Sequence, residues 1–122
     1  MLSANYKTVP MIARTANIVR DIANRDQQII VTNNKLAFVQ DFLEKTGYIQ
    51  YFSHIICQDK ALDVRTGEVI VILGRAKPHD TGYLEASSYF GLPSIVKYYG
   101  DNPKYDGQFA QNLGAEFIRP LA

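Results

Sequence analysis

The sequence predicts an α/β domain built on a parallel sheet with helices on both of its faces. Short β-branched runs alternate with segments whose apolar residues recur every three or four positions, a pattern typical of buried strands and amphipathic helices. Because successive parallel strands are joined by helical crossovers, this alternation favours one sheet covered on both sides. The chain has 122 residues, so we expect residues 1–122 to form a single domain.

The first half of the chain contains two predicted helices on either side of a strand. Residues 9–24 carry apolar side chains at helical spacing. "IIVT" at 29–32 is a short β-branched run, which predicts a buried strand. Residues 34–52 again show helical spacing, and Gly47 is the expected end of that helix.

The second half contains three predicted strands and two predicted helices, with an extended excursion after the first of these strands. "HIICQD" at 54–59 predicts another buried strand. Residues 59–75 alternate in polarity around Thr66-Gly67, so we expect a small β-hairpin there. The remaining expected elements are a helix at 80–90, a strand at 94–101, a helix between Pro103 and Gly114, and a last strand at 116–120.

Composition narrows the class of function. The formal net charge is +1, which argues against a broad basic surface for nucleic acid. Cys57 is the only cysteine, so an internal disulfide is impossible and a reducing compartment is the default. No apolar run reaches the length of a membrane span or of a signal-peptide core. We therefore expect a soluble cytoplasmic protein that binds neither nucleic acid nor membranes.

Polar residues at the ends of the predicted strands are the candidates for chemistry, because ligands of parallel sheets lie beyond the carboxyl ends of strands. The first such group is Thr32-Asn33-Asn34. A hydroxyl followed by the N-terminus of a helix suits a phosphate oxygen. The alternative is that Thr32 or Asn33 simply caps the helix.

The second group is "YYGDNPKYD" at 98–106. Gly100 would let the backbone turn sharply, with Asp101 at the tip of the strand and Asp106 near the first turn of the next helix. Two carboxylates at one strand end make a hard oxygen site, for which Mg²⁺ is the expected ion. The alternative is a turn aspartate followed by an aspartate that interacts with the helix dipole.

The third candidate is Lys77, which lies in "GRAKPHD" between the hairpin and the next helix. Its ammonium is a point charge that could neutralise a phosphoryl group or a carboxylate. The alternative is an ordinary surface lysine, although Pro78 fixes the direction of the backbone beside it. A Cys57–His54 nucleophile is a poorer candidate, because the two side chains would point to opposite faces of a strand.

Together these stretches resemble a known family. "IIVTNN", "RAKPHD" and "YYGDNPKYDGQFAQNLGA" are similar to the second, third and fourth motifs of the haloacid dehalogenase-like (HAD) phosphohydrolases, and the resemblance runs from about residue 27 to 119. It implies a three-layer, Rossmann-like parallel sheet. It also implies that Thr32, with Asn33 beside it, binds a phosphoryl oxygen. Lys77 would then steady a phosphorylated intermediate, while Asp101 and Asp106 bind Mg²⁺.

One part of the family pattern has no counterpart. The family's nucleophile is an aspartate in an Asp-x-Asp motif on a central strand, and this sequence contains no Asp-x-Asp. The resemblance therefore implies a sheet truncated at its N-terminal strand. Three arrangements remain open: the strand ending at Thr32 pairs with the strand ending near Asp101, residues 5–9 supply a substitute strand, or another polypeptide supplies one.

Three functions follow from these observations. The first is a phosphatase-like hydrolase domain that holds the Mg²⁺ and phosphate half of a site, acts on a phosphorylated ligand, and is inactive until a partner supplies the nucleophile. The second is a pseudoenzyme that serves as a structural or interaction subunit of an oligomer or complex. The third is a regulatory domain that binds phosphate without cleaving it. The sequence has too little material for a large cap, so an enzymatic site would be open and would suit a large substrate.

Overall fold

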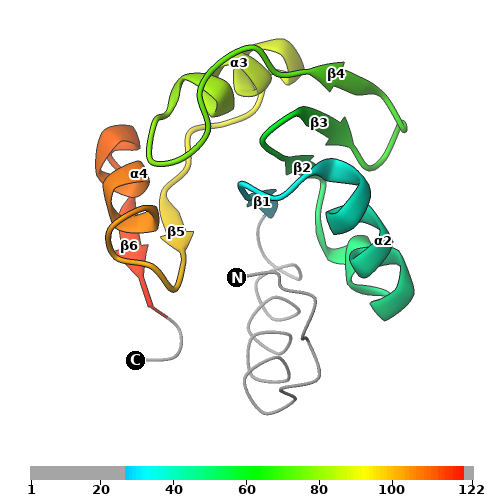
Figure 1. The fold of residues 1–122 in the computed structure, drawn as a ribbon, viewed down its shortest axis with the longest axis horizontal. Coiled ribbons are helices and arrows are strands. Elements are labelled where there is room, and N and C mark those ends of the chain that lie inside the picture. The colour runs from blue at the N-terminus through cyan, green and yellow to red at the C-terminus, as the bar shows by residue number, and fades with distance from the viewer. Residues whose placement is uncertain (1–26, 120–122) are drawn as a thin grey trace.

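The computed structural model describes residues 27–119 (Figure 1). The predicted helix at 9–24 and the possible strand at 5–9 lie outside this range. The elements are β1 (Ile29–Val31), α2 (Leu36–Thr46), the 3₁₀ helix η1 (Tyr48–Tyr51), β2 (His54–Ile56), β3 (Lys60–Asp63), β4 (Val69–Val71), α3 (Thr81–Phe90), β5 (Lys97–Tyr99), α4 (Asp106–Leu113) and β6 (Glu116–Ile118). The order of helices and strands predicted for this range is confirmed.

The main sheet is mixed, with strand order β1-β2-β3-β4. β1 and β2 are parallel, whereas the pairs β2–β3 and β3–β4 are antiparallel. The prediction of an all-parallel sheet is therefore wrong for this part. The difference arises from the hairpin at 59–75. The hairpin was expected to stand apart from the sheet, but its strand β3 pairs directly with β2. The turn is closed by Gly67, whose positive φ of 80° suits glycine and whose N–H donates to the Asp63 carbonyl at 2.8 Å.

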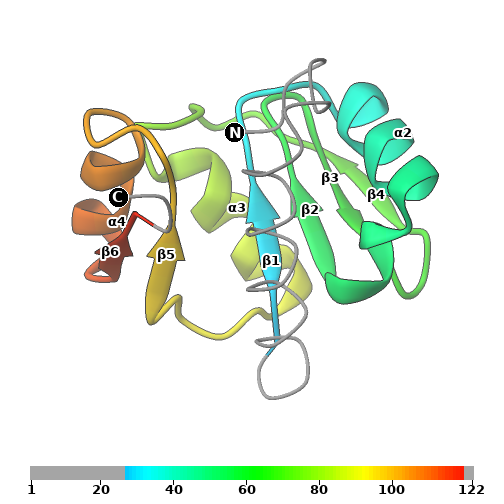
Figure 2. The same cartoon turned by 90° about the horizontal axis from the view of Figure 1, so that it is seen from below.

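β5 and β6 form a separate parallel pair, which α4 covers. β1 and β5 do not pair, so the closed-up arrangement considered from the sequence is wrong. Figure 2 shows the two strands running side by side, with no other described strand between them. We call the boundary between β1 and β5 the seam.

The main sheet is covered by apolar groups on both faces. On one face, Ile30, Ile55 and Leu62 pack against the buried side of α2. On the other face, the neighbouring residues of the same strands join α3, β5 and α4; this cluster contains Val31, Ile56, Ala61, Tyr83, Ala86, Tyr98, Phe109 and Ala110. Figure 1 shows α2 and α3 on opposite sides of the sheet, as the alternation of side chains along strands requires.

Two predicted helix ends are confirmed. α2 ends at Gly47 and α4 ends at Gly114, and both glycines adopt left-handed conformations with φ of 79° and 70°. This conformation lets the chain leave the helix while the glycine N–H still bonds to a carbonyl of the last turn. Among residues 27–119, no helix has the length and apolar character needed to cross a membrane.

Candidate phosphate and metal site

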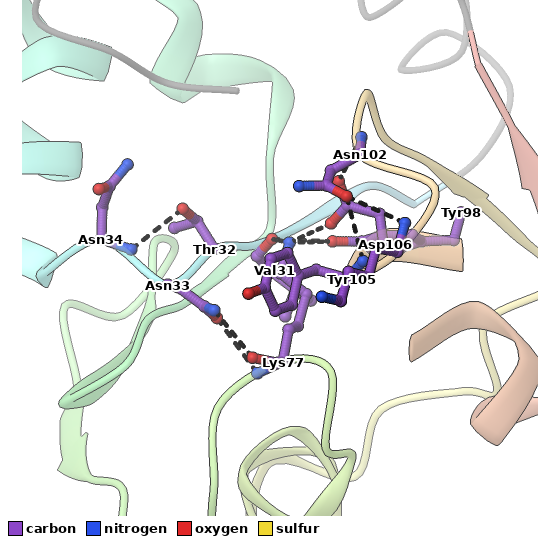
Figure 3. A network of polar contacts seen from close by, with 10 residues as sticks. Val31, Thr32, Asn33, Asn34, Lys77, Tyr98, Asn102, Tyr105 and Asp106 are labelled. Atoms are coloured by element: carbon purple, nitrogen blue, oxygen red, sulfur yellow. Dashed lines mark hydrogen bonds and ion pairs between the residues drawn. The ribbon is translucent and has the colours of Figure 1, made fainter. Parts of the chain in front are cut away.

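The seam is bridged by side chains where a backbone ladder would otherwise run. In β1, alternate residues bond to β2, as in the bond from the Thr32 N–H to the Ile56 carbonyl at 3.0 Å. Val31 therefore turns its carbonyl toward β5. That carbonyl accepts hydrogen bonds from the Tyr98 hydroxyl at 3.0 Å and from the Lys77 ammonium at 3.1 Å (Figure 3).

Lys77 is a buried cation, not a surface lysine. Its Nζ lies 2.6 Å from Asp106 Oδ1 and 2.8 Å from the Tyr98 hydroxyl, in addition to the Val31 carbonyl. The Lys77 and Asp106 side chains are only 12% and 8% exposed. An ammonium has three N–H donors, so each donor has an acceptor in this arrangement. The position of the Lys77 ammonium is therefore fixed by three hydrogen bonds, one of which is the ion pair with Asp106.

The backbone of Lys77 is held as firmly as its head group. The Asn33 side-chain amide accepts from the Lys77 N–H at 3.1 Å and donates to the Lys77 carbonyl at 2.9 Å. These two bonds join the end of β1 to the loop before α3, as Figure 3 shows. The Lys77–Pro78 peptide is cis. Asn33 thus acts on Lys77 through its backbone and is itself exposed.

Asp106 begins α4 and is presented by the loop after β5. Its second oxygen, Oδ2, accepts from the Asn102 N–H at 3.2 Å. Gly100 was expected to permit a sharp turn, but its φ is not positive. Its role is to make room: a Cβ on Gly100 would lie 2.5 Å from the Asp106 Cβ and 2.6 Å from its Cγ. Glycine at this position lets the Asp106 side chain pack directly against the strand end.

Asp101 is exposed at the tip of the same loop. Burial, together with the nearby charges of Asp106 and Asp101, raises the pKa of Tyr98 well above its ordinary value. Both carboxylates therefore act on the same hydroxyl. Among residues 27–119, no group of three or more His, Cys, Asp or Glu side chains gathers as a metal site. Mg²⁺ commonly binds proteins through one or two carboxylates and keeps several waters; of the two carboxylates expected to bind it, Asp106 already bonds to Lys77 and to the Asn102 N–H.

Thr32 follows β1 directly, but its hydroxyl is not among the partners of the Lys77 ammonium. It accepts from the Asn34 N–H at 3.2 Å, within its own turn. The N-terminus of α2 has no side-chain cap from its N-cap residue, and the Leu36 N–H donates to the Asp59 carboxylate at 3.1 Å. Asp59 comes from the β2–β3 loop, and its carboxylate accepts at the N-terminus of α2, where the sequence analysis expected either a cap by Thr32 or Asn33 or a phosphate oxygen.

The pocket that these residues line is small. A cavity of about 10 Å³ lies among residues that include Val31, Thr32, Lys77 and Phe109. That is close to the least volume that holds one water molecule. A phosphoryl group would therefore have to approach from the open side of the strand ends.

Two participants were missed by the sequence analysis. Tyr98 was given no role within "YYGDNPKYD", yet its hydroxyl bonds to β1 and to Lys77. Asp59 gave no signal beyond following a strand. The structure also makes Cys57 a poor nucleophile, because burial raises the pKa of its thiol to about 12.

The fold and the site define an α/β domain in which a buried lysine–aspartate pair lies at the ends of strands from two sheets. A family model described as haloacid dehalogenase-like hydrolase matches residues 2–119. The match covers nearly the whole chain, and the protein belongs to this family. Searches among curated proteins and among solved structures returned no significant match.

Proposed function

We propose that this chain forms one domain that carries the phosphate- and Mg²⁺-binding half of a HAD-like phosphatase site. The nucleophilic carboxylate comes from a segment other than these 122 residues, because the sequence has no Asp-x-Asp. The isolated chain is therefore inactive. We also propose a cytoplasmic setting, because the chain has one cysteine and therefore no internal disulfide.

One observation carries the proposal: Lys77 and Asp106, which are 29 residues apart, meet at 2.6 Å at the ends of strands from two sheets. A buried charge pair of this kind is costly to assemble, and replacing both of its members by apolar residues is often neutral or stabilising. Its presence in a member of a hydrolase family supports a role in binding an anion and a metal.

The residues have separate roles in this proposal. Lys77 provides positive charge for a phosphoryl group, and Asn33 positions it. Thr32 contributes its hydroxyl after rotating away from Asn34. Asp101 and Asp106 hold Mg²⁺, which would offset the negative charge of the phosphate when bound. Because the site is open at the strand ends, it suits a phosphorylated macromolecule better than a small sugar phosphate.

The seam also offers a route for the missing strand. By the alternation of each ladder, Ile29 and Val31 turn their backbone groups toward the seam, as do Lys97 and Tyr99 in β5. A strand from a partner protein could pair with either edge. The Val31 carbonyl is already occupied by Lys77 and Tyr98, so such a strand would have to displace these bonds or avoid that position.

Thermal unfolding of the purified chain with Mg²⁺ and inorganic phosphate tests the binding half of this proposal. A ligand that binds only the native state at about 100 times its dissociation constant stabilises it by about 2.7 kcal/mol. We expect stabilisation by Mg²⁺ that is lost in Asp101→Asn and kept in Asp41→Asn, a control on the exposed side of α2. No shift with either ligand would contradict the proposal.

An assay with a generic phosphate ester and Mg²⁺ tests the nucleophile half. We expect no turnover by the chain alone. Turnover that survived purification and was lost in Asp106→Asn would show that these residues contain a nucleophile after all, and the account of the missing carboxylate would be wrong.

A structural or interaction subunit is the second candidate. It is favoured by the saturated ammonium of Lys77, whose three donors are used by protein acceptors. In that case Lys77, Tyr98 and Asp106 serve to fasten the two sheets together. Absence of any response to Mg²⁺ and phosphate, with strong destabilisation on breaking the pair, would support this candidate over the first.

A further inference from the structure

Both oxygens of the Asp106 carboxylate already have donors from the chain itself. Oδ1 lies 2.6 Å from the Lys77 ammonium, and Oδ2 accepts from the Asn102 N–H at 3.2 Å (Figure 3). Mg²⁺ binds a carboxylate oxygen at about 2.1 Å, so a metal ion and the ammonium on Oδ1 would lie less than about 5 Å apart. Two cations repel each other at that distance. Lys77 and Mg²⁺ are therefore competitors for Asp106.

The backbone around Lys77 is held from two sides, so its side chain is the part that can move. The Asn33 amide bonds to both the N–H and the carbonyl of Lys77. From α4, the Asn112 side chain donates to the Pro78 carbonyl at 3.0 Å. The lysine side chain is a flexible four-carbon stem. The ammonium can therefore leave its carboxylate partner by rotation of the side chain, while the loop stays in place.

Release of the ammonium leaves its other described partners satisfied. The Val31 carbonyl keeps the hydrogen bond from the Tyr98 hydroxyl at 3.0 Å. The Tyr98 hydroxyl accepts from Lys77 at 2.8 Å, but its own hydrogen stays on Val31. The one contact that needs a replacement is the ion pair with Asp106, and a metal ion supplies the missing positive charge.

The released ammonium has a second place to act. Lys77 and Thr32 line the same small pocket, and Arg75 and His79 line it as well. Thr32 is the residue expected to meet a phosphoryl oxygen. A lysine that has left Asp106 offers three N–H donors to an anion at these strand ends. The same side chain can thus serve a carboxylate in one state and a phosphoryl group in the other.

We propose that the Lys77–Asp106 pair is an autoinhibitory contact, in which the chain's own ammonium holds the place of Mg²⁺ at Asp106. Asp106 exchanges the ammonium for the metal ion, and Lys77 then becomes available to a phosphoryl group. Mg²⁺ therefore binds before the anion, and each promotes the binding of the other. This inference rests on the proposed function, because it describes the regulation of that site.

Nitrogen-15 NMR of the lysine ammonium groups tests the exchange in the wild-type chain. Burial and hydrogen bonding slow exchange with water, so the Lys77 signal should be visible without metal and absent from Lys77→Met. Titration with MgCl₂ should shift or remove this signal in step with the changes at residues 100–106. Inorganic phosphate alone should leave it in place. A Lys77 signal that persists unchanged while Mg²⁺ binds, or that moves with phosphate alone, overturns the inference.

Calorimetric titration of two lysine variants with MgCl₂ separates the contact from net charge. Lys77→Met removes the competitor and should raise the affinity for Mg²⁺ about tenfold or more. Lys104→Met removes the same charge from the exposed loop before Asp106 and should change it about twofold or less. Equal effects of the two variants would overturn the inference. If Lys77→Met does not fold, the wild-type NMR titration decides.

The inference and the proposed function fail in different ways. Equal Mg²⁺ affinity in the wild type and in Lys77→Met overturns the autoinhibitory contact and leaves the binding site standing. Mg²⁺ binding by Lys77→Met but not by the wild type supports the contact, with an ammonium that the metal does not displace. Binding by neither chain overturns both.

Discussion

The two edges of the main sheet end in opposite ways. At the β1 edge, the outward carbonyl of Val31 is covered by a buried ammonium and a buried hydroxyl. At the β4 edge, the outward backbone groups are flanked by exposed valine and leucine side chains. One edge therefore joins another part of the same chain through polar side chains, and the other presents an apolar surface.

This difference shows how an unpaired strand edge can be used for two purposes. Backbone donors and acceptors at an edge need partners whether or not another strand is present. Polar side chains that meet this need at the seam also create a charged site at the strand ends. At the end of β4 the Leu73 N–H is met by the Glu85 carboxylate of α3, and the apolar side chains of the strand stay exposed. The variants below separate these two cases, from the largest expected effect to the smallest.

Breaking the Lys77–Asp106 pair should destabilise the fold most. Asp106→Leu leaves a buried ammonium without its counter-ion, and the expected loss is about 3–5 kcal/mol in the free energy of unfolding. The double variant Lys77→Met with Asp106→Leu should recover much of this loss, because it removes both charges. Chemical denaturation of the single and double variants measures the coupling. Additive losses would mean that the two groups do not interact.

A side chain added at Gly100, beside Asp106, should cause the next largest loss of stability. Gly100→Ala forces a Cβ to within 2.7 Å of Asp106 Oδ2, so the start of α4 must shift. Overpacking of this kind costs about 1–3 kcal/mol. Gly107→Ala is the matched control, since its Cβ would meet Phe117 at an ordinary 3.6 Å within a helix. The control should unfold at the same or a higher temperature; equal destabilisation of both would argue against the contact.

Removing one hydroxyl tests the bridge across the seam. Tyr98→Phe keeps the ring that packs on Phe109 at 5.0 Å but leaves the Val31 carbonyl and Lys77 with one partner fewer. We expect a loss of about 1–3 kcal/mol, measured by denaturation. Tyr105→Phe should change stability little, because Tyr105 is 44% exposed. A Tyr98→Phe variant as stable as the wild type would show that the hydroxyl does not fasten the sheets.

A pH titration examines the middle of the sheet, which both edges share. Burial lowers the pKa of His54 below its usual 6.5, and the nearby Asp63 charge offsets this only in part. As the pH falls, His54 therefore becomes protonated at a higher pH in the unfolded chain than in the native chain. His54 contributes stability above about pH 6.5, and this contribution is lost as the pH falls through the lower native value.

The slope of unfolding free energy against pH measures this effect. His54→Gln should reduce the slope below pH 6.5, because it removes the group whose pKa is lowered in the native chain. An unaltered slope in His54→Gln would contradict the assignment. The expected change is the smallest of the set, because a single group is involved.

The sequence predicted the local elements of residues 27–119 well, since spacing, turn glycines and strand composition are local properties. It did not predict that the hairpin would join the main sheet, because pairing between strands depends on contacts that no local pattern encodes. It placed Lys77 and Asp106 in one site through the family resemblance. It missed the Tyr98 hydroxyl, whose partners are 67 and 21 residues away.

The central claim is that the strand ends at the seam bind Mg²⁺ and phosphate. Two-dimensional NMR of the isotope-labelled chain, titrated first with Mg²⁺ and then with inorganic phosphate, tests it most directly. We predict that shift changes for Mg²⁺ centre on residues 100–106, and that phosphate adds changes at 31–34 and 76–78. Absence of any change, or changes centred on the β2–β3 region away from the seam, would contradict the account.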